Sequence, residues 1–149
     1  MAIRTQAVSV ERVVAAEPHD IFDLLCDPAQ HAVIDGSGMV RASRGASTER
    51  LRLGSTFGMD MKIGPVPYRI KNTVMEFEAN HLIAWCHPGK HRWRWELEAV
   101  DGGTLVRHTF DWSTARSPKV IELVGYPKRN AANMEATLER LADHFAAAD

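Results

Sequence analysis

The amino-acid sequence predicts an α+β domain in which a strongly curved antiparallel sheet of about six or seven strands wraps around a long C-terminal helix. Three observations predict this arrangement. A strand near the N-terminus runs directly into two short helices, and residues 38–112 then show strand patterns with closely spaced turns. A helical period follows and extends to the C-terminus. The sheet and the helix each have one apolar face, so burying both favours packing them against each other.

The N-terminal part contains the first strand and both short helices. Residues 7–16 place apolar residues at even spacing, as in a strand with one buried face. Pro18 suits the first position of a helix, where a missing N–H costs nothing. Asp27 and Pro28 repeat this start signal, and Gly36 and Gly38 end the second helix. Two short helices in tandem are therefore expected before the sheet continues.

The middle of the chain is predicted to form hairpins. Turn residues occur at Gly45, at Gly64 and Pro65, at Asn80, at Pro88 and Gly89, and at Gly102 and Gly103. The strands between them are expected over residues 38–44, 50–62, 67–78, 81–87, 91–100 and 104–112. Such short connections join antiparallel neighbours.

The last segment is predicted to be helical from Ser117 and Pro118 onward. Apolar residues recur there at helical spacing, at Met134, Leu138, Leu141 and Phe145. The run Gly125, Tyr126, Pro127 interrupts the early part, because proline lacks a backbone donor and clashes with the preceding turn. We expect a kink or a separate first helix at this point.

The last hairpin predicts which side chains face the concave side of the sheet. With Gly102 and Gly103 as a two-residue turn, Leu97 lies opposite His108 and Trp95 opposite Phe110. The apolar residues of both strands then share one face, while the charged residues form a solvated outer face. The concave set is Trp93, Trp95, Leu97, His108, Phe110 and Trp112.

Two further strands add methionines to this face. A tight turn at Ala79 and Asn80 pairs Phe77 with Leu82 and Met75 with Ala84. On the strand over 50–62, Met59 and Met61 share a face with Phe57 and Ile63. The ligand-binding candidates are therefore Trp93, Trp95, His108, Phe110, Trp112, Met59, Met61, Met75 and Phe77.

This face has two interpretations. An aromatic and methionine face on a sheet is typical of ordinary core. Four tryptophans in 149 residues, three of them in one hairpin, instead favour a ligand site, because they bring more bulk and more N–H groups than a small core needs. Methionines give an adaptable wall for apolar ligands.

His108 is the polar residue that this pairing places among apolar neighbours, where it needs a hydrogen-bond partner. It is either a core histidine satisfied by a carbonyl or water, a group that orients a ligand, or a general acid or base. The other catalytic candidates are Asp60, Tyr68 and Asp111. Asn72 and Arg69 are further polar residues whose facing the pattern leaves open.

Several site types are disfavoured. Cys86, His87, His91 and His108 are the one cluster suggesting a metal, but only His87 and His91 are placed to approach each other, so no metal site is expected. The sequence has no nucleophile elbow, phosphate-binding loop or dinucleotide fingerprint, and no cofactor is predicted.

Charge and composition limit the partners. With 18 basic and 19 acidic residues the net charge is -1, so nothing steers the protein onto nucleic acid. The chain has no apolar run long enough to enter a membrane and no secretion signal, and two cysteines far apart are expected to stay reduced. We expect one cytoplasmic domain over residues 1–149 whose partner is a hydrophobic small molecule. A homodimer is left open.

The sequence resembles the START-like superfamily, which has the helix-grip fold. This superfamily is also called SRPBCC or the polyketide cyclase/dehydrase and lipid-transport group. The resemblance covers nearly the whole chain and is carried by residues 10–18, 27–28, 36–38, 67–69, 91–97, 103–111 and 133–135. It implies a hydrophobic cavity between sheet and helix. It also implies three alternatives: a carrier of a lipid-, sterol- or polyketide-like molecule, a cyclase or dehydratase, or an interaction or regulatory subunit with a vestigial pocket.

Overall fold

The structure, a computed structural model, describes residues 2–4, 6–36, 40–44 and 50–146. Within these residues eight strands form one antiparallel sheet in the order β1-β2-β8-β7-β6-β5-β4-β3. The strands are β1 (Ala2–Arg4), β2 (Ala7–Val14), β3 (Val40–Arg44), β4 (Thr56–Ile63), β5 (Val66–Glu78), β6 (Leu82–Cys86), β7 (Arg92–Val100) and β8 (Gly103–Asp111). Seven of them correspond to the predicted strands. The sequence missed β1, a short edge strand that pairs with β2.

Three of the helical segments begin at the prolines that predicted them, Pro18, Pro28 and Pro118. The helical segments are α1 (Pro18–Leu25), the 3-10 turn η1 (Pro28–Gln30), α2 (His31–Ile34), α3 (Pro118–Leu123) and α4 (Tyr126–Ala146). The Asp27 side chain caps η1 by accepting a hydrogen bond from the Ala29 N–H at 3.0 Å. Gly125, at φ +76°, separates α3 from α4, which confirms the predicted break.

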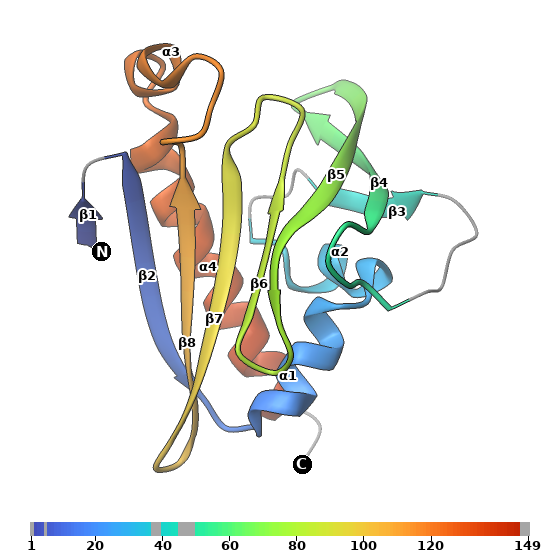
Figure 1. Cartoon of the computed structure of the whole chain (residues 1–149), viewed down its shortest axis with the longest axis vertical. Helices are drawn as coiled ribbons and strands as arrows, with labels where there is room; N and C mark the ends of the chain where they lie inside the picture. The colour runs from blue at the N-terminus through green and yellow to red at the C-terminus, as the bar shows by residue number, and fades with distance from the viewer. Residues whose placement is uncertain (1, 5, 37–39, 45–49, 147–149) are drawn as a thin grey trace.

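The long helix α4 lies across one face of the curved sheet, where it contacts β2, β8 and α2 (Figure 1). Met134, Leu138 and Leu141 of α4 are buried there, together with strand residues such as Val10 and Val106. The predicted fold class is confirmed, because the antiparallel sheet and the C-terminal helix cover each other's apolar faces. Among the described helices, none is long and apolar enough to cross a membrane.

The register of the last hairpin differs from the prediction by two residues. Asp101 and Gly102 form its turn, and Trp95 lies opposite His108 while Trp93 lies opposite Phe110. Gly103 belongs to the strand at φ +145°, where an added Cβ would lie 2.0 Å from the Val14 carbonyl oxygen. This glycine therefore serves a close backbone approach, not the turn. A shift of two preserves which side chains share a face.

The hairpin between β5 and β6 also departs from the prediction. Phe77 pairs with Ile83, not with Leu82, because three residues form the turn, with Asn80 at φ +64°. A bulge between Val74 and Glu76 then interrupts the ladder at Met75.

The strand predicted over residues 50–62 begins at Thr56. Residues 51–55 instead form a turn, in which Gly54 has φ +84° and the Ser55 hydroxyl accepts a hydrogen bond from the Arg52 N–H at 2.9 Å. The predicted helix end at Gly38 and the predicted turn at Gly45 lie outside the described residues.

The outer face of the sheet carries a charged network. Glu76 accepts hydrogen bonds from Arg94 at 2.8 Å and from Arg92 at 2.9 Å, and Arg94 also contacts Asp111 at 3.2 Å. These side chains are 15–25% exposed, so the network is less solvated than the sequence predicted. The hydrogen bond from Arg94 holds the pKa of Glu76 below its usual value.

Candidate functional site

A cavity of about 310 Å³ lies between the sheet and helices α2 and α4. This volume is at the lower end of the range for small-molecule sites, roughly 300–1,000 Å³. The residues that line it come from α1, α2 and α4 and from strands β4 to β8 and the loop after β6. They are Leu25, His31, Ile34, Asp35, Met59, Met61, Ile63, Tyr68, Ile70, Asn72, Trp85, His87, His91, Trp93, Trp95, His108, Phe110, Tyr126, Arg129, Asn130, Asn133, Met134 and Thr137.

Aromatic rings from neighbouring strands form the sheet side of the cavity. The Trp95 indole stacks on the His108 imidazole, with ring centroids 3.7 Å apart and planes 16° apart. The ring centroids of Trp93 and Phe110 are 4.9 Å apart. These four residues meet because they are directly opposite pairs on the concave face of β7 and β8. Trp85 also stacks on His31 of α2, with ring centroids 4.8 Å apart and ring planes 16° apart.

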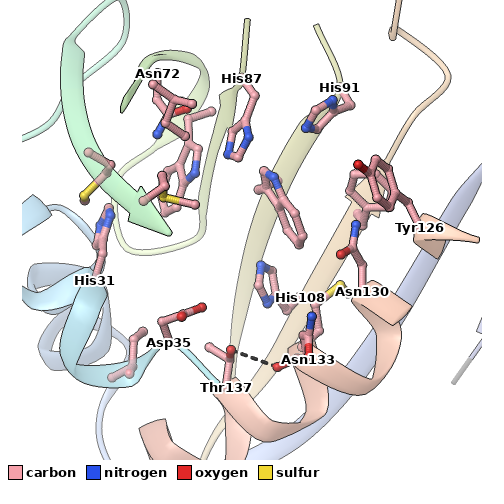
Figure 2. Close-up of a pocket in the computed structure, with 18 of the residues that line it drawn as sticks. His31, Asp35, Asn72, His87, His91, His108, Tyr126, Asn130, Asn133 and Thr137 are labelled. Atoms are coloured by element: carbon pink, nitrogen blue, oxygen red, sulfur yellow. Dashed lines mark hydrogen bonds between the residues drawn. The ribbon is translucent and has the colours of Figure 1, made fainter. Parts of the chain in front are cut away.

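Four of the seven histidines line this cavity: His31, His87, His91 and His108 (Figure 2). Burial disfavours the charged imidazole, and it lowers the pKa of His31 to about 4 and the pKa of His108 to about 3. Burial, with a smaller contribution from His91, lowers the pKa of His87 to about 3, and burial also lowers the pKa of His91. The imidazoles of the cavity are therefore neutral at pH 7.

Several polar atoms of these lining residues have no hydrogen-bond partner. Within the described residues, the buried side-chain atoms without a partner are Asn72 Oδ1, His91 Nδ1, Trp93 Nε1, Trp95 Nε1, His108 Nδ1 and His108 Nε2. All five residues line the cavity. Buried polar groups in folded proteins are normally paired, so this concentration at one place indicates a site for a molecule that supplies the missing partners.

Helix α4 forms the opposite side of the cavity (Figure 2). Thr137 accepts a hydrogen bond from the Gly36 N–H at 2.9 Å and donates one to the Asn133 carbonyl at 2.9 Å, which joins the chain after α2 to the helix. The Arg129 guanidinium lies over the Tyr126 ring, 4.7 Å from its centroid. The charged lining residues that the structure describes are Asp35 and Arg129.

Seven of the sequence-predicted residues line the cavity: Trp93, Trp95, His108, Phe110, Met59, Met61 and Tyr68. Burial raises the pKa of the Tyr68 phenol above its usual value.

Three predicted ligand-binding residues do not line the cavity. Met75 is 42% exposed, because the bulge turns it away from the concave side. Phe77 packs edge-on against Phe22 of α1, with ring centroids 5.4 Å apart, and is not among the lining residues. Trp112 follows the end of β8, and its indole N–H donates to Glu122 at 2.9 Å.

The two predicted catalytic carboxylates lie elsewhere. Asp111 belongs to the outer network with Arg94. Asp60 lies 3.7 Å from Arg69 in a partly exposed ion pair, and neither residue lines the cavity. Strand alternation explains both positions, because the neighbours Met59, Met61 and Phe110 face inward. Of the four predicted catalytic candidates, His108 and Tyr68 line the cavity.

The cysteine and histidine cluster considered for a metal is divided between two faces of the sheet. His87 and His91 have ring centroids 4.8 Å apart and line the cavity, whereas Cys86 lies opposite Arg92 on the other face. Over the described ranges 2–4, 6–36, 40–44 and 50–146, no three histidine, cysteine or carboxylate side chains come together as a metal site.

Sequence reasoning missed several lining residues on β6 and on the helices. They include Trp85, His31 and Tyr126, whereas Asn72 of β5 is a polar residue whose facing the pattern left open. Asn130, Asn133 and Thr137 were also missed, although a signal was available. They follow each other at helical spacing and share the side of α4 that carries Met134, so they are polar residues at the end of an apolar stripe.

A curved antiparallel sheet around a long C-terminal helix, with a cavity between them, is the helix-grip architecture of START-like, or SRPBCC, domains. The family model "Polyketide cyclase / dehydrase and lipid transport" matches residues 5–146. The chain belongs to this family.

The relatives by sequence include the uncharacterized protein Rv0088 of Mycobacterium tuberculosis H37Rv, 41% identical over 138 residues, which cover 89% of this chain and 61% of that protein. The uncharacterized protein MT0096 of Mycobacterium tuberculosis strain CDC 1551 is 40% identical over 138 residues, which again cover 89% of this chain and 61% of that protein. The chain thus spans about three fifths of the length of these curated relatives.

Solved structures share the fold. A Rhodobacter sphaeroides protein has a TM-score of 0.74 and 21% identity, covering 97% of this chain and 94% of its own. The AHSA1-like protein of Aeromonas hydrophila has a TM-score of 0.70 and 20% identity, covering 95% and 93%.

Proposed function

We propose that this chain binds an uncharged hydrophobic small molecule, lipid-, sterol- or polyketide-like, in the cavity between the sheet and α4. The observation that carries the proposal is the cavity of about 310 Å³ whose lining holds every buried, unpartnered side-chain polar atom of the described residues. A packed core would leave neither the space nor the unmade hydrogen bonds.

The nature of the lining supports a neutral, apolar ligand. Aromatic and aliphatic side chains predominate, and the four histidines are neutral at pH 7. Apolar walls with a few placed polar groups are typical of small-molecule sites. The methionines Met59, Met61 and Met134 make part of this wall adaptable.

Binding is favoured over catalysis as the proposed activity. Neither Asp60 nor Asp111 lines the cavity, and no described residue hydrogen-bonds to His108. A general base is normally oriented by a second group, and a pKa near 3 makes His108 a weak base at pH 7.

Isothermal titration calorimetry with a long-chain fatty alcohol, a sterol and a hydroxyanthraquinone tests the proposal. Met61→Trp fills part of the cavity and should abolish binding of any ligand that the natural protein takes up. Met75→Trp is the matched control, because Met75 lies exposed outside the cavity and should leave affinity unchanged. Absence of binding across the panel, or equal affinity in Met61→Trp, would overturn the proposal.

A further inference from the structure

We propose that the ligand is a neutral aromatic molecule that enters with a hydroxyl-bearing edge inward, against Trp93, Trp95 and His108. This inference rests on the proposed function and names the class and orientation of its ligand. A simple lipid would enter the other way, with its hydrocarbon chain inside and its polar group toward water.

The two tryptophans require an acceptor. An indole N–H is a donor only, and neither Nε1 of Trp93 nor Nε1 of Trp95 has a partner among the described residues. Trp95 is 2% exposed, so bulk water does not serve it. A hydrocarbon placed here would leave both donors unpaired, whereas an oxygen atom of a ligand can accept from them.

The His108 ring lacks one hydrogen-bond acceptor and one donor. A neutral imidazole has one N–H and one lone pair, and both of its nitrogens are buried without a partner. Asn72 Oδ1, also lining the cavity, lacks a donor as well. A hydroxyl can serve either nitrogen, because it accepts from an N–H or donates its own proton to a lone pair.

A carboxylate does not fit this position. The one permanently cationic residue among the described lining residues is Arg129, which is exposed and lies over Tyr126 on α4. His108 and Trp95 stack in the buried wall of the sheet, with no cation in the described lining beside them. A buried carboxylate without a partner is costly, and it has no proton for the His108 lone pair or Asn72.

The shape of the wall favours flat rings. Two indole–imidazole pairs, Trp95 with His108 and Trp85 with His31, are stacked within 16° of parallel and line the same cavity. Phe110, Trp93, Tyr68 and Tyr126 add further rings. Aromatic ligands gain from offset stacking and edge contacts with such side chains.

A series of three naphthalenes tests the inference by calorimetry: 2-naphthol, 2-methylnaphthalene and 2-naphthoate. They share one ring system and differ in whether the substituent is a hydroxyl, a methyl or a carboxylate. We expect 2-naphthol to bind about tenfold more tightly than 2-methylnaphthalene, which corresponds to about 1.4 kcal/mol. We expect 2-naphthoate to bind most weakly.

Trp95→Phe removes one of the donors and should reduce the preference for 2-naphthol over 2-methylnaphthalene. Trp112→Phe is the matched control and should keep it, because the Trp112 N–H donates to Glu122 outside the cavity. The indole N–H signals in a 1H–15N spectrum of the natural protein make the test independent of variant folding. Those of Trp93 and Trp95 should move further downfield with 2-naphthol than with 2-methylnaphthalene, while that of Trp112 stays in place.

Equal affinities for the hydroxyl and methyl compounds, or tightest binding of the carboxylate, would overturn the inference while the proposed function stands. Failure of all three naphthalenes to bind would overturn it too. The proposed function fails separately, through the wider panel and the Met61→Trp comparison.

Discussion

Gly36→Ala should loosen the attachment of the chain after α2 to α4 and lower the free energy of unfolding by about 3 kcal/mol. An added Cβ would lie 2.6 Å from the Ala136 Cβ and 2.6 Å from the Thr137 backbone nitrogen. Carbon atoms pack at about 3.5–4 Å, so the two segments must separate by about 1 Å. Overpacking of this kind costs about 1–3 kcal/mol, and stretching the Gly36–Thr137 hydrogen bond adds about 1 kcal/mol.

Thermal and urea denaturation followed by circular dichroism measure this loss, which corresponds to a decrease in Tm of roughly 6–12 °C. Gly54→Ala is a control of a different kind, because its φ is +84° but nothing lies within 4 Å of an added Cβ. It should cost about 1–2 kcal/mol through backbone strain alone. Only Gly36→Ala should also weaken ligand binding, since Thr137 lines the cavity.

Adding Ala136→Gly to Gly36→Ala should restore only part of the stability, because the contact with the Thr137 backbone nitrogen remains. A decrease in the free energy of unfolding of less than about 1 kcal/mol for Gly36→Ala alone would refute the reasoning. It would mean that α4 can move away from residue 36 with little loss of packing.

Three further predictions concern titration, charge and thiol reactivity. Because the pKa values of His31 and His108 are lowered in the folded protein, the unfolded chain binds protons that the folded protein does not bind. The free energy of unfolding therefore has its full value above about pH 6.5 and decreases as the pH falls below it. The contribution of these two histidines to the free energy of unfolding should fall by up to about 2.7 kcal/mol per pH unit toward pH 4, and equal urea midpoints at pH 7.5 and 5 would contradict this. Glu76→Gln should cost about 2 kcal/mol in urea denaturation, because Arg92 loses its anion and Arg94 keeps only Asp111. Arg107→Gln, in a more exposed pair, should stay within about 1 kcal/mol. Burial raises the pKa of Cys26 to about 11, so iodoacetamide at pH 8 should alkylate it only on unfolding, as mass spectrometry of the labelled peptide would show.

The order of elements could be predicted because each carries a local signal. Prolines mark the starts of α1, η1 and α3, and Gly125 marks the break before α4. The concave set on β7 and β8 was largely found because facing depends only on strand parity. The predicted cross-strand pairs of this hairpin were wrong. A sequence does not distinguish a glycine that a turn requires from one, such as Gly103, that a close backbone approach requires.

Other parts of the site depend on contacts between distant segments. The bulge at Met75 has no local signature, and it reversed the facing expected for that side chain. His31 stacks on Trp85 from another element, 54 positions along the chain, so no spacing rule links them. The side of α4 that meets the cavity, including Asn133, is set by how the helix crosses the sheet.

The two-residue alternation of β8 also restricts how this protein can change in length. Deleting one residue within β8 would exchange its faces, bringing Arg107, Thr109 and Asp111 into the cavity and His108 and Phe110 onto the outside. Deleting two would keep every ring on its side. Among descendants of this sequence, insertions and deletions in the cavity strands should therefore survive in even numbers, while the loops between them vary freely.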